Sequence, residues 1–237
     1  MVTPSYSITC SKKQLIAPGV YELRFSKPDG FSFRAGQFVL FDVPLISNAS
    51  DIQPRAYSIA SSPSEHELIF VVKVKEGGRF GEWLTRKLDK GSSLMMKGPF
   101  GLFTLNEKPH HFIFAATGAG IAPFRSHIND ALEHSDTRQI DLFFGVRHHD
   151  DLFWTDEFTA LSASHTNFKV HLCLSGDNKE WKGNHGRIQT FIPSIIKDPL
   201  STELYICGAP EMVKDIKALA LENWKLPKAN VHGEGYI

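Results

Sequence analysis

A change of pattern near the middle of the chain narrows the possible folds more than any other feature. From about residue 106 onward, short apolar runs alternate with amphipathic helical patterns. Such alternation predicts a doubly wound α/β domain with a parallel sheet. The predicted strands cover residues 111–115, 140–145, 168–174 and 204–207, and the predicted helices cover residues 122–133, 152–161, part of 188–196, and 211–224.

Before this change the chain is rich in β-prone runs. The predicted strands cover residues 6–10, 20–25, 38–43, 55–60 and 68–74. Several short strands separated by turn residues predict a small barrel or sandwich. The polar residues 45–53 predict a loop, and Gly98-Pro99-Phe100-Gly101 predicts a rigid turn. We therefore expect a first domain at residues 1–105 and a second at residues 106–237.

Composition excludes several classes of protein. Of 237 residues, 42% are hydrophobic and 22% are charged, which is ordinary for a soluble globular protein. The formal net charge of +0 argues against a general nucleic-acid binder. No apolar run reaches the roughly 18 residues of a membrane span, and the N-terminus lacks the pattern of a secretory signal. Three scattered cysteines, Cys10, Cys173 and Cys207, fall short of the about four thiolates of an iron–sulfur cluster and suit a reducing cytoplasm.

The run Arg55-Ala56-Tyr57-Ser58 places a cation, an aromatic ring and a hydroxyl at one strand end. A guanidinium offers several donors in a fixed fork, which suits a phosphate. Side chains two positions apart on a strand share a face, so the ring lies beside the cation. The set suits a flavin nucleotide, although an ordinary strand entry gives the same pattern.

Two glycine-rich loops have the character of phosphate sites. Gly77-Gly78-Arg79-Phe80-Gly81-Glu82-Trp83-Leu84 predicts a loop that opens a helix, whose free backbone N–H groups attract an anion such as pyrophosphate. The alternative is a glycine-rich hairpin tip. Thr117-Gly118-Ala119-Gly120-Ile121-Ala122-Pro123 follows a predicted strand and precedes a predicted helix, with proline where the dinucleotide fingerprint has its third glycine.

Other polar positions are less specific. Cys207-Gly208 ends a predicted strand, where ligands of parallel sheets gather, although free cysteines are usually just buried. His148-His149-Asp150-Asp151 and His110-His111 contain metal-ligand residue types, but neighbouring residues rarely converge on one ion. We therefore interpret both runs as polar loops and predict no metal site.

Taken in order, the motifs resemble those of the ferredoxin–NADP reductase superfamily, and the resemblance covers nearly the whole chain. It implies a two-domain fold, with an N-terminal antiparallel β-barrel that binds FAD and a C-terminal doubly wound parallel sheet that binds NAD(P).

The resemblance implies roles for residues of the first domain. Arg55, next to Ala56, would bind the flavin pyrophosphate, Tyr57 would stack on the isoalloxazine, and Ser58 would hydrogen-bond near N5. Residues beside the ribityl and adenine side would be Val72, Lys73 and Val74. The backbone donors for the pyrophosphate would come from Gly78, Phe80, Gly81, Glu82 and Trp83.

In the second domain, the resemblance implies that Thr117, Gly118, Gly120 and Ile121 hold the pyridine nucleotide. Arg147 and Ser175 belong to segments that read the adenosine end. Cys207 and Gly208 would lie near the nicotinamide. From the C-terminus, Tyr236 would lie on the flavin face that nicotinamide must occupy, with Glu234 nearby; a solvated tail is the alternative. The residues expected at the chemistry are Ser58, Cys207, Glu234 and Tyr236.

Two departures from the family pattern matter. Gly81 stands where the family usually has serine or threonine, so one hydrogen bond to phosphate is missing. Gly176 and Asp177 follow Ser175, where NADP-specific members often have a basic residue. The acidic side chain disfavours a 2′-phosphate, whereas Arg147 favours one, so NADH and NADPH both stay open.

We therefore predict a FAD-dependent NAD(P)H oxidoreductase, expected as a monomer, that passes electrons to a separate small redox protein, ferredoxin first. One alternative is an NAD(P)H–flavin reductase, which residues 31–37 resemble. A second is a non-catalytic electron-transfer subunit that binds FAD and docks on a partner enzyme.

Overall fold

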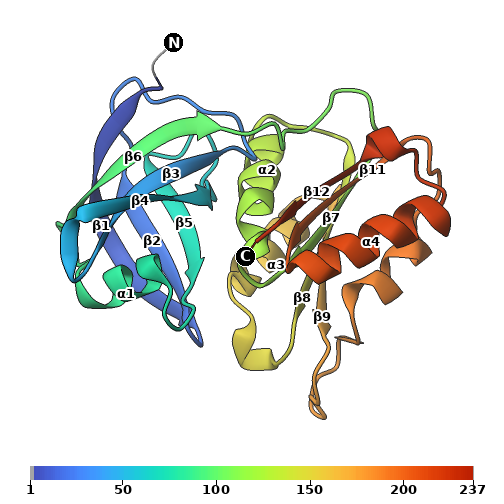
Figure 1. The fold of residues 1–237 in the computed structure, drawn as a ribbon. Helices are drawn as coiled ribbons and strands as arrows, with labels where there is room; N and C mark the ends of the chain where they lie inside the picture. The colour runs from blue at the N-terminus through green and yellow to red at the C-terminus, as the bar shows by residue number, and fades with distance from the viewer. Residues whose placement is uncertain (1–2, 237) are drawn as a thin grey trace. The chain divides into compact units, whose positions relative to one another are not determined.

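The computed structural model describes residues 3–236, which form two compact units (Figure 1). The first unit runs to Leu105 and also includes Arg125–Asp130. The second contains Asn106–Phe124 and the chain from Ala131 onward. Among the described residues, no helix has both the length and the apolar character needed to cross a membrane.

The first unit is a six-stranded antiparallel sheet with one helix. Its elements are β1 (Ser5–Ala17), β2 (Val20–Ser26), β3 (Phe38–Leu45), β4 (Asn48–Ser58), β5 (Glu67–Lys73), α1 (Arg79–Arg86) and β6 (Ser93–Phe100). The strand order is β4-β3-β6-β1-β2-β5. Just after β4, the Ala60 amide donates to the Ile69 carbonyl of β5 at 2.8 Å, so the two edge strands meet. The predicted antiparallel barrel is confirmed.

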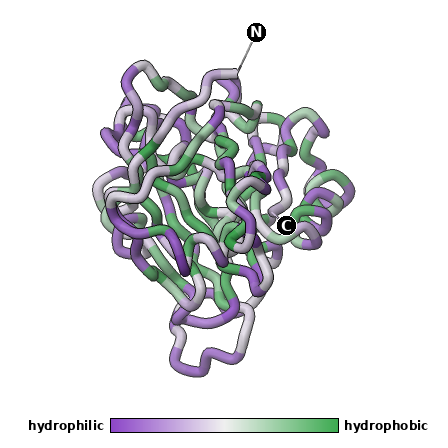
Figure 2. The backbone as a smooth tube through the Cα atoms, turned by 60° about the vertical axis from the view of Figure 1, so that its left-hand side comes forward, coloured by the Kyte–Doolittle hydropathy of each residue, from purple (hydrophilic) through white to green (hydrophobic). Residues whose placement is uncertain are grey.

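Aromatic side chains fill the barrel. Phe41 packs edge-on against Phe70 with ring centroids 4.8 Å apart, and Phe25 packs against both rings. All three rings are fully buried. Each such side chain contributes roughly 1.5–3 kcal/mol by leaving water. Figure 2 shows hydrophobic residues concentrated along the strands and hydrophilic residues in many connecting loops.

Two sequence predictions in this unit were wrong. Residues 45–53 were expected to form a loop, but β4 begins at Asn48 and pairs with β3, with Ile52 opposite Pro44 and, after an irregularity, Asn48 opposite Leu45. This hairpin is held by backbone hydrogen bonds and stays largely exposed, so its polar side chains hid the strand. Residues 98–101 were expected to form a turn, but β6 continues through Gly98 to Phe100.

The second unit is a six-stranded parallel sheet covered by helices. Its strands are β7 (His111–Thr117), β8 (Gln139–Val146), β9 (Phe168–Leu174), β10 (Asn184–His185), β11 (Thr202–Gly208) and β12 (Val231–Gly235). Its helices are α3 (Thr155–Ser164), α4 (Pro210–Glu222) and the two ends of α2 (Ala122–Glu133), whose middle residues Arg125–Asp130 group with the first unit. Short 3-10 turns complete it: η1 (Gly118–Ile121), η2 (His149–Asp151), η3 (Ile188–Thr190), η4 (Ile192–Ile195) and η5 (Lys228–Asn230). The strand order is β10-β9-β8-β7-β11-β12.

Helices pack on both faces of this sheet. On one face, α4 places Val213 and Ile216 in a core cluster with Ile206 of β11. On the other, Phe124 of α2 stacks on Phe114 of β7 with centroids 4.9 Å apart, and α3 packs against β9. The doubly wound prediction is confirmed. Because all strands are parallel, their carboxyl ends meet at one edge of the sheet, where ligands gather in such folds.

Candidate functional site

The ring of Tyr57 is fixed near the end of β4 by aromatic neighbours. It stacks on Phe41 with centroids 5.3 Å apart and an interplanar angle of 27°, and it contacts Phe80 of α1 at 4.8 Å. Burial raises the pKa of the Tyr57 hydroxyl above its ordinary value, so the ring stays neutral. One part of Tyr57 remains exposed. The side chain is therefore a rigid, uncharged surface on which a flat ligand ring can stack.

Arg55 lies on the same strand face as Tyr57, as the sequence predicted. Its guanidinium donates to the side chain of Gln53 at 2.8 Å and to the Pro54 carbonyl at 2.9 Å. Both acceptors are neutral, so the positive charge is not cancelled by either of them. Ser58 is buried at the end of β4, and Ala56, between Arg55 and Tyr57, is exposed.

The first turn of α1 is a second feature of the first unit. Gly78 is the N-cap, and no side chain among the described residues caps the helix there. The N–H groups of the first turn lack intrahelical acceptors, so this end attracts an anion. A Cβ at Gly78 would lie 3.0 Å from the Lys75 carbonyl oxygen, so any side chain there would press on the preceding turn. These observations fit a phosphate-binding helix start.

Gly81 explains one departure from the family pattern. A Cβ at this position would lie 3.0 Å from Val74 Cγ1 and 3.4 Å from the Lys75 carbonyl oxygen. A serine or threonine there would force Val74 to shift. Residues 74 and 75 thus pack so closely against α1 at Gly81 that a side chain able to donate to phosphate does not fit without a shift.

Several residues expected to contact the flavin have side chains that are buried in the barrel or bonded to other groups. Val72, Phe80 and Trp83 belong to the buried core of the barrel. Lys73 is exposed and donates to the Pro18 carbonyl at 2.8 Å. Val72, Phe80 and Trp83 can therefore meet a ligand only through their backbone. The Glu82 amide already donates to the Gly78 carbonyl at 2.9 Å.

In the second unit, the glycine loop after β7 packs directly on the end of β11. A Cβ at Gly120 would lie 2.3 Å from the Cys207 carbonyl oxygen, and one at Gly208 would lie 2.2 Å from Thr117 Oγ1. The Thr117 hydroxyl accepts a hydrogen bond from the Ala209 amide at 3.2 Å. Four predicted residues, Thr117, Gly120, Cys207 and Gly208, therefore meet at the carboxyl edge of the sheet.

The remaining residues of this loop differ in role. Gly118 has a φ of +52°, and a Cβ added to it would have no atom within 4 Å, so this residue faces open space. Ile121 is fully buried and can act on a ligand only through its backbone. The loop combines a close backbone approach with an open side, as a phosphate cradle requires.

Cys207, Glu234 and Tyr236 form a cluster at the same edge. Cys207 pairs in register with Glu234 across β11 and β12, and the Tyr236 amide donates to the Gly208 carbonyl at 2.8 Å. Burial raises the pKa of the Cys207 thiol, a shift that a hydrogen bond with Tyr236 only partly opposes. Burial also raises the pKa of the Glu234 carboxyl. The cluster places a neutral thiol opposite a carboxyl whose pKa is raised.

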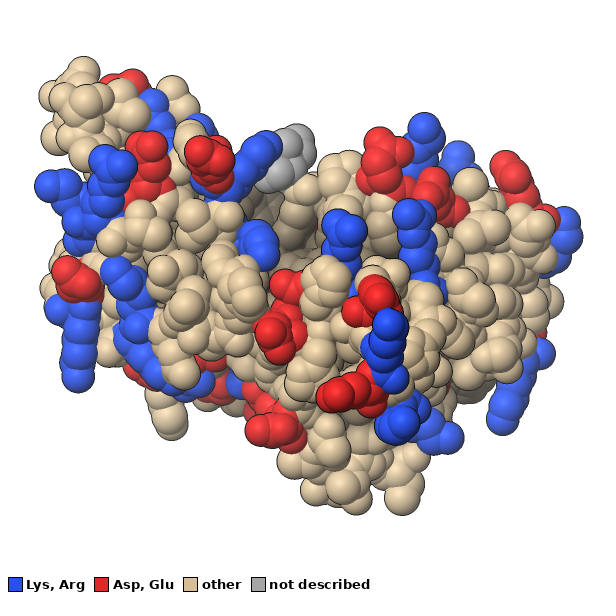
Figure 3. Space-filling view, turned by 90° about the horizontal axis from the view of Figure 1, so that it is seen from below, with Lys and Arg blue, Asp and Glu red and all other residues tan. Residues whose placement is uncertain are grey.

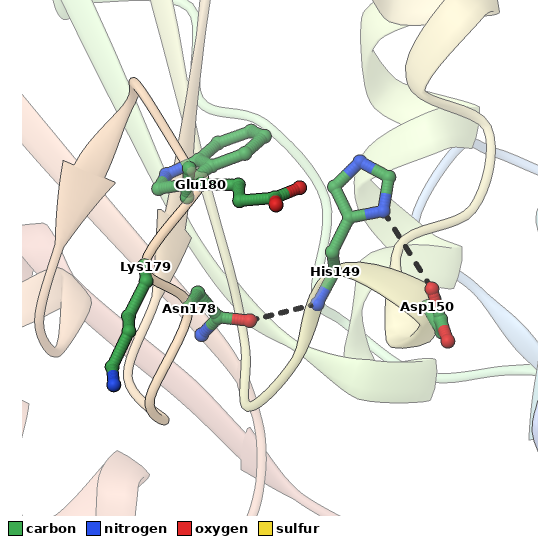
Figure 4. Close-up of a pocket in the computed structure, with 6 residues that line it drawn as sticks. His149, Asp150, Asn178, Lys179 and Glu180 are labelled. Carbon is green, nitrogen blue, oxygen red and sulfur yellow. Dashed lines mark hydrogen bonds and ion pairs between the residues drawn. The ribbon is translucent and has the colours of Figure 1, made fainter.

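A pocket of about 470 Å³ opens between the loops that follow β8 and β9. Its lining residues are His149, Asp150, Asn178, Lys179, Glu180 and Trp181. The His149 amide donates to Asn178 Oδ1 at 3.2 Å, which joins the two loops (Figure 4). The Glu180 carboxylate points across the pocket toward His149, and Lys179 points away from it (Figure 4).

Arg147 and Ser175 flank this pocket rather than line it. Ser175 Oγ donates to the Val146 carbonyl at 3.3 Å, and the Gly176 amide donates to the Arg147 carbonyl at 2.8 Å. Sequence reasoning interpreted His149 and Asp150 as an ordinary polar loop and missed Asn178 and Trp181. Their position after two strands of a parallel sheet was the available signal.

Charged side chains of both signs lie interspersed on the face shown in Figure 3. This pattern accompanies equal totals of 26 basic and 26 acidic residues. A nucleic-acid surface would gather Lys and Arg on one face. No group of three or more His, Cys, Asp or Glu side chains within residues 3–236 is arranged to hold a metal ion.

Comparison with known proteins assigns both units. The profile described as "Oxidoreductase FAD-binding domain" matches residues 7–105, and "Oxidoreductase NAD-binding domain" matches residues 114–218. Ferredoxin--NADP reductase B of Sorangium cellulosum is 34% identical over 93% of this chain and 93% of its own length. The chain belongs to the ferredoxin–NADP reductase family. This family member is therefore a FAD-dependent NAD(P)H oxidoreductase.

More distant relatives differ in length. One subunit of the Na(+)-translocating NADH-quinone reductase of Yersinia pseudotuberculosis is 31% identical over 86% of this chain, but the match spans only 62% of that subunit. A ferredoxin NADP+ reductase from Neisseria gonorrhoeae, solved with bound FAD and NADP, matches with a TM-score of 0.82 and 22% identity over 98% of each chain. Cytochrome P450 reductase GcoB of Amycolatopsis matches with a TM-score of 0.84 and 23% identity over 99% of this chain and 71% of its own.

Proposed function

We propose that the chain is a ferredoxin–NAD(P) reductase with a FAD-binding domain at residues 1–105 and an NAD(P)-binding domain at residues 106–237. The observation that carries this proposal is the presence of one phosphate cradle in each unit. The uncapped start of α1 accompanies Arg55 and Tyr57 in the first unit, and the loop at Gly120 packs on Cys207 in the second.

The residues of the first domain bind and orient the flavin. Arg55 and the free N–H groups in the first turn of α1, at Phe80 and Gly81, donate to the pyrophosphate. Gly78, Glu82 and Trp83 shape the same turn, in which the Gly78 and Glu82 amides already donate to the Lys75 and Gly78 carbonyls. Tyr57 stacks on the ring system, and Ser58 hydrogen-bonds beside it. The backbone of Val72, Lys73 and Val74 lies along the ribityl and adenine side. When bound, FAD supplies the redox chemistry, because it accepts a hydride and passes electrons on singly.

The residues of the second domain bind and orient the nucleotide. Thr117, Gly118, Gly120 and Ile121 cradle its pyrophosphate, whereas Cys207 and Gly208 border the nicotinamide. Glu234 and Tyr236 complete this end of the site. Because burial raises the pKa of Glu234, its carboxyl exchanges a proton closer to neutral pH than an exposed glutamate does. Orientation of the reacting ring is the main contribution of these groups.

The pocket after β8 and β9 holds the adenosine end of the nucleotide, beside Arg147 and Ser175. The rings of His149 and Trp181 lie 5.8 Å apart and offer aromatic surface to a base. Asp150 and Glu180 put two carboxylates in the lining against one lysine. Carboxylates repel a 2′-phosphate and accept hydrogen bonds from a ribose diol, so this lining supports a preference for NADH.

The acceptor is proposed as a ferredoxin or a similar small redox protein, as the name of the Sorangium relative suggests. Cys10, Cys173 and Cys207 are buried free thiols in different places, so these three do not form a site for an iron–sulfur cluster. Free thiols also fit a reducing compartment, and we place the protein in the cytoplasm as a monomer.

An anaerobic absorbance spectrum of the purified protein tests the donor side. A flavin band should be present and should bleach on addition of NADH, and more slowly on addition of NADPH. A colourless protein that acts only on added flavin would establish the flavin-reductase alternative. A yellow protein that neither nucleotide bleaches would establish a non-catalytic subunit.

The acceptor side needs a separate assay. Under anaerobic conditions, a catalytic amount of the reductase with excess NADH should reduce an added [2Fe–2S] ferredoxin. The readout is the loss of the visible absorbance band of the ferredoxin. Free FAD at the same concentration is the control. Flavin that bleaches without any transfer to ferredoxin would refute this acceptor while leaving the donor side intact.

A further inference from the structure

The register of β12 decides where two candidate site residues lie. Among residues 3–236, β12 is an edge strand that pairs only with β11, from Val231 opposite Leu204 to Gly235 opposite Gly208. Side chains alternate between faces along a strand, so a slip by one residue would turn Glu234 away from Cys207. Something must hold this short strand in place at its free edge.

The side chain of His232 has such a holding site. Its ring stacks on that of Tyr205 with centroids 4.4 Å apart and an interplanar angle of 23°. Its Nε2 atom lies 3.5 Å from Glu203 Oε2, an ion-pair distance. His232 is directly opposite Tyr205 in the ladder, so the contact forms only in the observed register.

The partners of His232 are themselves fixed. The Tyr205 hydroxyl donates to Glu203 Oε2 at 2.7 Å, and Asn106 Nδ2 donates to Glu203 Oε1 at 2.7 Å. Tyr205 is fully buried, and Glu203 is 5% exposed. Burial alone would raise the pKa of Glu203, but the nearby His232 ring and the hydrogen bonds from Asn106 and Tyr205 keep that pKa below its ordinary value. A buried, charged acceptor is costly unless every partner is present.

We infer that His232 is a positioning residue: its contacts with Tyr205 and Glu203 set the register of β12 and thereby hold Glu234 and Tyr236 beside Cys207. Val231 packs against the core cluster beneath α4, on the strand face opposite to Glu234, and Lys217 donates to the Gly233 carbonyl at 3.3 Å, so within β12 the contacts of His232 are the ones that share a face with Glu234. The inference rests on the proposed function, in which Glu234 and Tyr236 help to place the nicotinamide.

The variant His232→Ala tests this inference in the full-length, FAD-loaded protein. The first readout is hydrogen–deuterium exchange of the amides of residues 231–236, which should accelerate while the amides of β8 stay unchanged. The second is stopped-flow reduction of the flavin by NADH. Its limiting rate should fall by about ten-fold or more, whereas the apparent Kd for NADH should change by less than about two-fold, because misplacement of groups near the chemistry acts mainly on the rate.

Two further variants separate positioning from general loss of stability. His232→Gln keeps a donor toward Glu203 and should restore the rate to within about three-fold of the wild type, because the buried carboxylate keeps a partner. The control is His171→Ala, because His171 Nε2 also contacts a buried carboxylate, Asp141 Oδ1, at 2.6 Å. This contact lies on the α4 face of the sheet, so its loss should lower Tm and leave the rate unchanged.

Different outcomes would overturn the role of His232 and the proposed function. Unchanged exchange and rate in His232→Ala, or an equal loss of rate in His171→Ala, would overturn the inference. Wild-type protein whose flavin is not reduced by either nucleotide would instead overturn the proposed function.

Discussion

Tyr57 is the side chain on which flavin retention should depend most directly. Replacement by alanine removes a ring held by Phe41 and Phe80, so a stacked ligand loses its platform. Tyr57→Ala should weaken FAD binding by about ten-fold or more, since stacking is worth about 0.5–1.5 kcal/mol beyond the buried area. Fluorescence titration of the apoprotein with FAD measures this change.

The matched control is Tyr57→Phe, which keeps the ring and removes only the hydroxyl. It should retain FAD at nearly wild-type affinity. Wild-type affinity in Tyr57→Ala would contradict the stacking role.

Glu180 is the residue whose charge should bear on the choice of nucleotide. Its carboxylate points into the pocket after β9 (Figure 4). Glu180→Gln removes a repulsion toward a 2′-phosphate and should raise kcat/KM for NADPH relative to NADH by about two- to five-fold, the range of exposed charge pairs. Steady-state assays with both nucleotides measure the ratio.

Lys179→Met is the complementary variant, because it removes a positive charge from the same lining and should lower the NADPH to NADH ratio. A ratio unaffected by both substitutions would place the 2′ position outside this pocket.

At the scale of elements, the contact between η1 and the end of β11 makes Gly120 obligatory. A methyl group there would lie 2.3 Å from the Cys207 carbonyl oxygen and 2.6 Å from Gly208 Cα. Gly120→Ala should therefore destabilise the protein by about 1–3 kcal/mol, as overpacking does, and should weaken nucleotide binding. Urea unfolding and NAD+ titration measure the two effects.

Gly118→Ala is the comparison for Gly120→Ala. A methyl group at residue 118 would meet no atom within 4 Å, so the alanine would be strained only by the backbone φ of +52°. Its cost should be about 1 kcal/mol. An equal effect of the two substitutions on nucleotide binding would show that the close approach at Gly120 is unimportant.

For the whole molecule, acid should lower stability in two steps. His127 lies in the first unit, and burial lowers the pKa of its imidazole to about 3, so the folded protein keeps it neutral. Between about pH 6.5 and 3 only the unfolded chain takes up this proton, so the free energy of unfolding falls as pH decreases, by about 1.4 kcal/mol per pH unit.

The second step belongs to Asp141 in the second unit. Burial would raise the pKa of Asp141, but hydrogen bonds from His111 and His171 hold that pKa below its ordinary range. Stability from this carboxylate is present above the unfolded value of about 3.9 and is lost as pH falls below it. The His127 effect therefore begins at a higher pH than the Asp141 effect, and the two overlap only below about pH 3.9.

Urea unfolding at pH 7 and pH 5 tests the first step. His127→Gln cannot titrate, so it should flatten the dependence on pH between these values, whereas the exposed His66→Gln should leave it unchanged. The same slope in wild type and His127→Gln would rule out the buried imidazole as its source.

Local patterns determined much of this protein. The helix predicted at residues 122–133 coincides with α2, and the glycines at 77, 78, 118 and 120 lie at the loops that open helices, as predicted. Turn chemistry and hydrophobic periodicity act over a few residues, so a sequence displays them directly.

The tertiary structure alone decided the rest. The exposed first half of β4 carries no periodic apolar signal, because its pairing uses backbone groups that every residue shares. Neither the pocket that joins His149 to Asn178 nor the stack of His232 on Tyr205 has a local signature. Each arises because parallel pairing brings residues that are 27 or more positions apart into contact at one edge or face of a sheet, and sequence spacing cannot show which pairs will meet.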